Sequence, residues 1–222
     1  FRRVLLRSKM KMPLQNIQKR KEEFIMAIIN FVYEELLLWK KQLRQNNLNE
    51  KKLNENLSKY LSIKAHQRDM LFSFQHEASQ EGESTVDICA YLESNIDNIT
   101  VFECKRLPIP KPTSRKDEYV TGHKDITGGI QRFKLCKHGK DHAIVGMIGY
   151  VENGTFDNHQ SEINECISKL AGTTDENNAY WNYDENLKKI DLNNDKAKYK
   201  SVHDRLDADR IQIYHLWINM QK

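Results

Sequence analysis

The chain has 222 residues, enough for one domain with a core of ordinary size; 30% are charged and 39% are hydrophobic. Its net charge of +4 is mild, and acids and bases are interspersed, so the composition permits a nucleic-acid partner without requiring one. The longest apolar run, Phe24 to Tyr33, is too short to span a membrane, and no signal peptide is apparent. We therefore expect a cytoplasmic protein without a membrane partner.

Two helices are predicted at the start of the chain. Residues 14 to about 45 carry apolar side chains at helical spacing, and Pro13 suits the first turn of such a helix. An Asn-rich stretch interrupts this helix, and a second one is predicted from about residue 50 to 66. The sequence thus predicts an N-terminal helical arm at 1–48 and a main domain at 49–222.

The main domain is predicted to begin with three strands, at 70–76, 86–91 and 100–107. The later elements are a proline-rich loop at 108–124, a short helix at 130–135, a buried strand at 143–151, a helix at 159–170, loop and short helix at 173–200, a surface turn at Ser201–Arg205, and a strand at 211–217. Gly146 and Gly149 in the buried strand indicate that something packs closely on its backbone. This order predicts an α/β protein with a mixed sheet flanked by helices.

The four cysteines show no Cys-x-x-Cys spacing. Cys89 and Cys104 fall in predicted core strands. Free thiols in a reducing compartment are the simplest interpretation, and they agree with a cytoplasmic location.

Two acids and a lysine are the candidate catalytic residues. Side chains alternate along a strand, so Glu103 and Lys105 share one face, and Asp87 lies in the preceding strand. An acid on one strand and an acid and a lysine on the next can hold a divalent metal against a phosphodiester. The alternative is a buried acid–lysine pair that braces a strand edge, but such a pair contributes little net stability. A second Glu-x-Lys, Glu50-Lys51-Lys52, lies in a polar stretch, and we interpret it as a solvated helix face.

The segments Val86-Asp87 and Glu103-Cys104-Lys105 resemble the PD-(D/E)xK nuclease superfamily, although Val86 stands where the family usually has proline. The resemblance implies a restriction-endonuclease-like core of about five strands flanked by helices, with an N-terminal helical extension. It implies that Asp87, Glu103 and the backbone carbonyl of Cys104 bind Mg²⁺, with Mn²⁺ as a substitute. Lys105 would orient the nucleophile or offset charge on the phosphate.

The resemblance extends to two helices. The segment Asn54-Glu55-Asn56-Leu57 resembles the first core helix of these nucleases, which implies that Glu55 completes the acidic cluster and serves as a metal ligand; otherwise Glu55 is an ordinary exposed helix residue. Gly128-Gly-Ile-Gln-Arg-Phe133 resembles the helix after the lysine strand. We expect Gln131 near the metal site and Arg132 as a phosphate or structural contact.

The resemblance implies a metal-dependent deoxyribonuclease, an endonuclease of bacterial defence, restriction or repair. The alternative is a catalytically silent nuclease-fold module that binds nucleic acid or docks a partner in a larger assembly. Four basic residues of the proline-rich loop could line a DNA groove or be simply solvated: Lys111, Arg115, Lys116 and Lys124.

The aromatic stripe of the first helix, which includes Phe24, Phe31 and Trp39, needs a cover. Either the body of the same domain or a second copy of the chain supplies it. We favour a homodimer, because two catalytic centres can cut both strands of a duplex.

Overall fold

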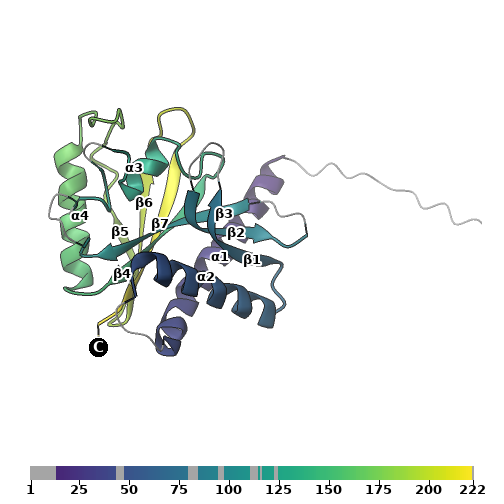
Figure 1. The fold of residues 1–222 in the computed structure, drawn as a ribbon. Helices are drawn as coiled ribbons and strands as arrows, with labels where there is room; N and C mark the ends of the chain where they lie inside the picture. The colour runs from purple at the N-terminus through teal and green to yellow at the C-terminus, as the bar shows by residue number, and fades with distance from the viewer. Residues whose placement is uncertain are drawn as a thin grey trace, which may run out of the picture.

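The computed structural model describes residues 14–43, 48–79, 85–94, 98–110, 115, 117–122 and 125–221. Within these ranges the chain forms a mixed seven-stranded sheet with helices on both faces (Figure 1). Two hydrophobic clusters lie on the two faces: α1 and α2 cover one, and α3 and α4 cover the other. The mixed α/β class expected from the sequence is confirmed.

The described residues form four helices that pack on the sheet: α1 (Leu14–Gln42), α2 (Glu50–Gln67), α3 (Gly129–Lys134) and α4 (Phe156–Leu170). Two of them begin at side-chain caps. Asn49 accepts a hydrogen bond from the backbone of Lys52, and Thr155 accepts one from the backbone of Asn158. These caps satisfy N–H groups of the first turn that have no partner within the helix. The start of α2, which matters for the candidate site, is thereby fixed at Glu50.

The strands are β1 (Phe72–Ser79), β2 (Thr85–Leu92), β3 (Asn98–Leu107), β4 (Ile144–Val151), β5 (Lys188–Leu192), β6 (Lys196–His203) and β7 (Ile211–Asn219). Their order across the sheet is β1-β2-β3-β4-β7-β6-β5. β4 runs parallel to both β3 and β7, and the other neighbours are antiparallel. β4 is the central strand, and β3, which carries the predicted catalytic residues Glu103 and Lys105, lies directly beside it.

Strands β5 and β6 correct the prediction of loop and short helix at 173–200. Along β6 the lysines Lys196, Lys198 and Lys200 alternate with buried or small side chains, which is the period of a strand. Their ammonium groups lie over tyrosine rings, as Lys196 does over Tyr33 at 4.2 Å, so this basic face is packed rather than solvated. The predicted surface turn at Ser201–Arg205 is also wrong in its first part, because β6 extends to His203 and Ser201 is buried.

Helix α1 packs on the sheet of its own chain. The ring of Phe31 stacks on Phe74 and meets Phe72 edge to face, while Trp39 lies against Tyr150. Residues of α1, which lies in the helical arm predicted at 1–48, thus belong to the same hydrophobic cluster as α2 and the sheet. The chain's own domain covers the aromatic stripe, so the stripe no longer argues for a homodimer.

The two glycines of β4 are confirmed as points of close packing. A Cβ atom on Gly146 would lie 2.1 Å from a ring carbon of Phe102, and one on Gly149 would lie 2.4 Å from the indole of Trp217. Both rings belong to the directly paired residue of the neighbouring strand. Only a residue without a side chain leaves space for them.

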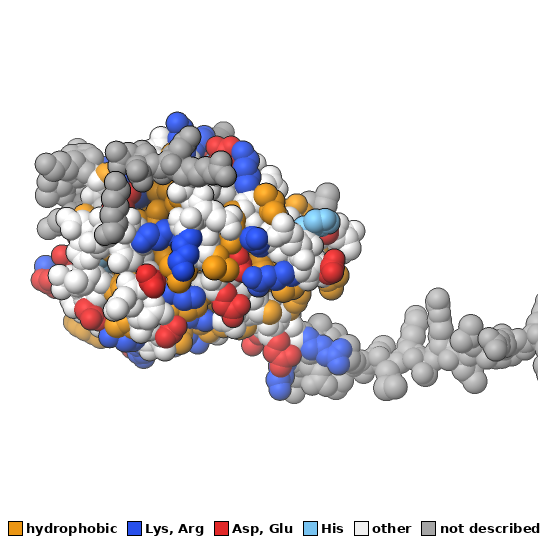
Figure 2. All heavy atoms as spheres, turned by 90° about the horizontal axis from the view of Figure 1, so that it is seen from below, with side chains coloured by type: hydrophobic (Ala, Val, Ile, Leu, Met, Phe, Trp, Pro, Cys, Tyr) orange, Lys and Arg blue, Asp and Glu red, His pale blue; other side chains and the backbone are white. Residues whose placement is uncertain are grey.

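Several other expectations are met in the described residues. All four cysteines are free thiols, with Cys89 and Cys104 buried. No helix in the described ranges is long and apolar enough to cross a membrane. The face seen from below in Figure 2 carries Lys and Arg interspersed with Asp and Glu, as the composition indicated.

Candidate active site

The carboxylate of Asp87 lies where regular pairing of β2 with β3 ends. The last paired residues on this side are Ile88 and Phe102. Beyond them, Oδ2 of Asp87 accepts a hydrogen bond of 2.7 Å from the backbone N–H of Cys104. The side chain thus takes the place of a ladder partner and is held against the motif segment of β3.

Glu103 is almost fully buried, at 1% exposure, and three basic groups surround its carboxylate. Oε1 accepts from Lys105 Nζ at 2.9 Å and from Arg132 Nη1 at 2.6 Å. Oε2 lies 3.0 Å from Nδ1 of His138. Burial by itself would raise the pKa of Glu103, but Lys105, His138 and Arg132 outweigh it and hold the pKa well below its usual range.

Asp87 shows the opposite behaviour. Burial, and then repulsion from Glu103, raise its pKa to about 7, against the opposing effects of Lys105 and the Cys104 amide. Burial would lower the pKa of Lys105, but attraction to Glu103, Glu50 and Asp87 outweighs burial and raises it. The structure therefore brings Asp87, Glu103 and Lys105 close enough to act on one another's charge.

The acid that α2 contributes is Glu50, not Glu55. Glu50 is half-buried, and its Oε2 accepts a hydrogen bond of 3.0 Å from the backbone N–H of Arg106 in β3. Its charge acts on both Asp87 and Lys105. Glu55 instead pairs with Lys59 at 2.6 Å, and its side chain is 47% exposed.

The structure therefore does not bring Glu55 to the motif residues, and it places Glu50, which we interpreted as part of a solvated helix face, against β3. Five residues advance a helix by about 140° beyond one full turn, so the two glutamates face in different directions. The sequence did hold a signal for Glu50: Asn49 is a typical N-cap, and an acid directly after it lies in the first turn.

On α3 the two neighbours Gln131 and Arg132 contact different parts of the structure. Gln131 is fully buried; its Nε2 donates to Asp175 at 2.8 Å and its Oε1 accepts from the backbone of Gly122 at 3.0 Å. It is a structural contact. Arg132 reaches Glu103, and its Nε donates to the carbonyl of Ile126 at 3.2 Å. Adjacent residues point about 100° apart on a helix, so only one of the pair can face the acid.

His138 was missing from the predicted site. It follows α3 and contacts a carboxylate 35 residues earlier in the chain. Nothing in the local sequence indicates this contact, because it depends on how α3 and the segment after it pack on β3. We refer to Glu50, Asp87, Glu103, Lys105, Arg132 and His138 together as the Glu103 cluster.

The predicted DNA-binding loop is described only in part. Lys111, Lys116 and Lys124 lie outside the described residues. Arg115 forms two hydrogen bonds with Glu118, at 2.7 and 2.6 Å, so its charge is largely offset within the loop. The described part of the loop therefore adds little to a basic groove.

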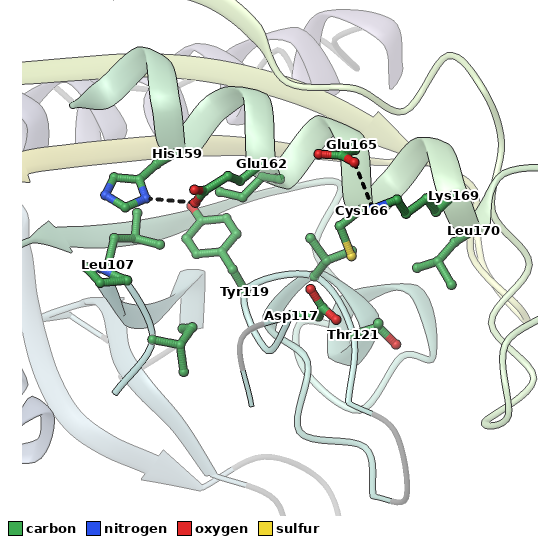
Figure 3. Close-up of a pocket in the computed structure, with 14 residues that line it drawn as sticks. Leu107, Asp117, Tyr119, Thr121, His159, Glu162, Glu165, Cys166, Lys169 and Leu170 are labelled. Carbon is green, nitrogen blue, oxygen red and sulfur yellow. Dashed lines mark ion pairs between the residues drawn. The ribbon is translucent and has the colours of Figure 1, made fainter. Parts of the chain in front are cut away.

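Two cavities lie near this end of β3. One, of about 280 Å³, adjoins the Glu103 cluster and is lined by Thr85, Ile126, Arg132, Lys137 and His138. The other, of about 510 Å³, lies between α4 and the segment around Leu107 and Tyr119 (Figure 3). No charged member of the Glu103 cluster lines the larger cavity, so the smaller one is the relevant opening.

The donor chemistry of the Glu103 cluster suits Mg²⁺, which prefers carboxylate oxygens. The geometry of these side chains suits a metal ion less well than their chemistry does. In the described part of the chain no three His, Cys, Asp or Glu side chains are grouped so that they could hold a metal ion. At this site both oxygens of Glu103 are already engaged by basic side chains.

Comparison of the chain with protein-family models, with curated proteins and with solved structures finds no match, so the resemblance described above rests on the motif residues alone.

Proposed function

We propose that this chain is a metal-dependent nuclease that hydrolyses phosphodiester bonds of DNA, of the PD-(D/E)xK type. The observation that carries the proposal is the meeting of Asp87, Glu103 and Lys105 with a third acid, Glu50, at one end of the β2–β3 pairing. Acids from two strands and a helix, with a lysine beside them, are the groups that metal-assisted phosphodiester hydrolysis requires.

The burial of these charges supports a functional role. Taking several charged side chains out of water is costly, and their mutual attraction rarely repays the cost, so apolar residues would stabilise the fold at least as well. The pKa of Asp87, about 7, marks a buried carboxylate whose negative charge is not fully compensated. A divalent cation at this position would supply the missing charge.

The residues that would hold the metal are Asp87, Glu103 and the Cys104 carbonyl, with Glu50 beside them. Held by these residues, Mg²⁺ would supply Lewis-acid chemistry, which polarises a phosphodiester and lowers the pKa of bound water. Lys105 has a raised pKa and keeps its proton at neutral pH, so it does not act as a general base. Its role is that of a fixed cation, which orients the attacking water or offsets the charge that grows on the phosphate.

The alternative, a catalytically silent module that only binds nucleic acid, is favoured by one observation. Glu103 is saturated by Lys105, Arg132 and His138, and a carboxylate held in this way is a poor metal ligand as it stands. The two functions differ in whether the phosphodiester is cut.

The decisive experiment is cleavage of supercoiled plasmid DNA in Mg²⁺ or Mn²⁺, combined with a gel-shift assay of DNA binding. We expect the wild type to cut and Lys105→Ala to bind but not cut. Lys59→Ala, which removes an exposed lysine paired with Glu55, is the matched control and should cut normally. A wild type that binds DNA without cutting it in either metal would establish the silent module, and one that does neither would overturn both functions.

A further inference from the structure

Of the three basic groups that hold Glu103, Arg132 is the most accessible. Its side chain is 27% exposed, compared with 10% for Lys105 and 4% for His138. His138 is also packed edge to face against the ring of Phe133. Lys105 is tied to Glu103 by its position two residues along the same strand. Arg132 is therefore the group that can leave the carboxylate at the least cost in packing.

Arg132 also faces an opening suited to an anion. It lines the cavity of about 280 Å³ together with His138 and Lys137, and Thr85 adds a hydroxyl group. A guanidinium binds phosphate with two parallel hydrogen bonds, as it binds carboxylate, so a phosphate in this cavity would compete with Glu103 for the same donors. The cavity is large enough for a phosphate group and the adjoining sugar atoms.

We propose that Arg132 is a latch: it withholds Glu103 from the metal until a phosphate of the nucleic acid enters this cavity and takes over the guanidinium. The proposal rests on the proposed function and explains why the donor set suits Mg²⁺ while Glu103 is closed to it. In this view metal binding and nucleic-acid binding are coupled events at one site.

The charges of the Glu103 cluster explain why metal binding and phosphate binding should favour each other. Glu50, Asp87 and Glu103 are three carboxylates, held together by Lys105 and Arg132 with His138 beside them. When the guanidinium turns to a phosphate, Glu103 faces the other acids with less compensation, which raises its affinity for a divalent cation. The phosphate in turn is held more tightly beside a bound cation. Each ligand therefore strengthens the binding of the other by the same factor.

The test is the affinity for Mn²⁺, measured from the electron paramagnetic resonance signal of the free ion and independent of cleavage. The probe is a short DNA duplex with phosphorothioate linkages, and a titration of the duplex alone is subtracted. We expect the duplex to tighten Mn²⁺ binding by the wild type by roughly 5- to 150-fold, the usual range for coupled sites. Arg132→Met should bind Mn²⁺ more tightly without the duplex and show little further gain with it.

Arg210→Met is the matched control, because Arg210 pairs with Asp184 and Asp204 and has no contact with Glu103 among its ion pairs. It should behave as the wild type does. If Arg132→Met does not fold, Arg132→Lys takes its place, because lysine keeps the charge but lacks the paired N–H donors of the guanidinium. The duplex should then tighten Mn²⁺ binding less than it does in the wild type, and an equal gain would contradict the latch.

Two outcomes contradict the latch, and they differ in what they say of the function. Tight Mn²⁺ binding by the wild type that the duplex does not change overturns the latch and leaves the nuclease proposal standing. No Mn²⁺ binding by the wild type or by Arg132→Met, with or without the duplex, overturns both.

Discussion

Glu50 accepts a hydrogen bond of 3.0 Å from the backbone N–H of Arg106, although 56 residues separate them in the chain. This bond ties the first residue of α2 to β3 directly after Lys105. The carboxylate of Asp87 is bound to the amide of Cys104 on the same strand. Two acids from different elements are thereby fixed to alternate backbone amides of β3, which gives the candidate site its geometry.

The first prediction separates the two glutamates of α2. Glu50→Gln should lower plasmid cleavage by on the order of tenfold to a hundredfold, the usual cost of losing a group that supports a metal site. Glu55→Gln, on another side of the helix, should lower it less than about twofold. Cleavage rates at saturating Mg²⁺ provide the measurement. Cleavage by Glu50→Gln at the wild-type rate would show that Glu50 does not belong to the site, and an equal large loss in Glu55→Gln would show that the two glutamates are not distinguished by the helix face.

The second prediction concerns metal-dependent stability. A cation that binds only the folded site stabilises it by mass action, by about 2.7 kcal/mol at one hundred times the dissociation constant. Thermal melts of the wild type should therefore rise with increasing Mn²⁺ or Mg²⁺, and those of Asp87→Asn should not. Asp157→Asn, which removes an exposed acid paired with Lys189, is the control and should retain the rise. Melts of the wild type that do not respond to either metal would count against a metal site at Asp87.

Much of the fold was predictable because its central strands consist largely of apolar residues. β3, β4 and β7 carry long apolar stretches, and the Glu-x-Lys motif stands out against them. β5 was missed because nearly all of its residues are exposed. β6 was missed because its lysines suggest solvent, whereas their ammonium groups lie over tyrosine rings. The period-two pattern was present, but the polarity of the residues concealed it.

The candidate site was predictable only for residues on the same strand or on consecutive strands. Glu103 and Lys105 are two residues apart, and Asp87 is on the next strand, so strand geometry alone suggests that they meet. Arg132 and His138 reach Glu103 from 29 and 35 residues away, and Glu50 reaches β3 through the placement of α2. Such contacts depend on tertiary packing, which no local pattern specifies.

The third prediction concerns a buried chain of hydrogen bonds that joins β7 to β6. Trp217 can only donate, and its Nε1–H bonds to the hydroxyl of Tyr119 at 2.8 Å. That hydroxyl then donates to Nδ1 of His215 at 2.9 Å, which leaves the Nε2–H of His215 to donate to Ser201 at 2.8 Å. His215 is therefore neutral in the folded protein.

The chain continues to a second histidine. The hydroxyl of Ser201 donates to Nε2 of His203 at 2.7 Å, and Nδ1 of His203 lies 3.3 Å from Glu185, a long contact. Glu185 also accepts from Lys134 at 2.6 Å. In this sequence of donors and acceptors Nε2 of His203 is an acceptor, so His203 is neutral as well. Both rings therefore resist protonation as long as the protein is folded.

The resulting pH dependence has a definite sign. Burial lowers the pKa of His215 well below its ordinary value of 6.5, and it lowers that of His203 despite the opposing charge of Glu185. Below about pH 6.5 these two histidines take up protons in the unfolded chain but not in the folded protein, so their contribution to stability falls with decreasing pH. Asp87, with its pKa raised to about 7, contributes in the opposite sense over the same range. The slope approaches about 1.4 kcal/mol per pH unit for each histidine.

Urea unfolding of the wild type and of His215→Gln between about pH 7.5 and 5 isolates the contribution of His215, because Asp87 contributes equally to both proteins. Glu185, with its pKa lowered to about 2, contributes mainly below its unfolded value and does not obscure the result. His215→Gln should show a slope smaller by one proton, even if its stability at neutral pH is lower. The same slope in the wild type and in His215→Gln would mean that His215 is not held neutral by the fold.

The last prediction concerns the packing that supports the motif strand. Gly146 of β4 is paired with Phe102, which directly precedes Glu103, and a Cβ on this glycine would lie 2.1 Å from the phenyl ring. Phe102 is fully buried and has no space into which to retreat, so Gly146→Ala should destabilise the fold by about 1–3 kcal/mol. Phe102→Leu frees the space that the ring occupies, so adding Gly146→Ala to that variant should cost clearly less. Urea unfolding of the two single variants and the double variant gives the coupling energy between the two positions. Additive effects would show that the ring of Phe102 is not what requires a glycine at position 146.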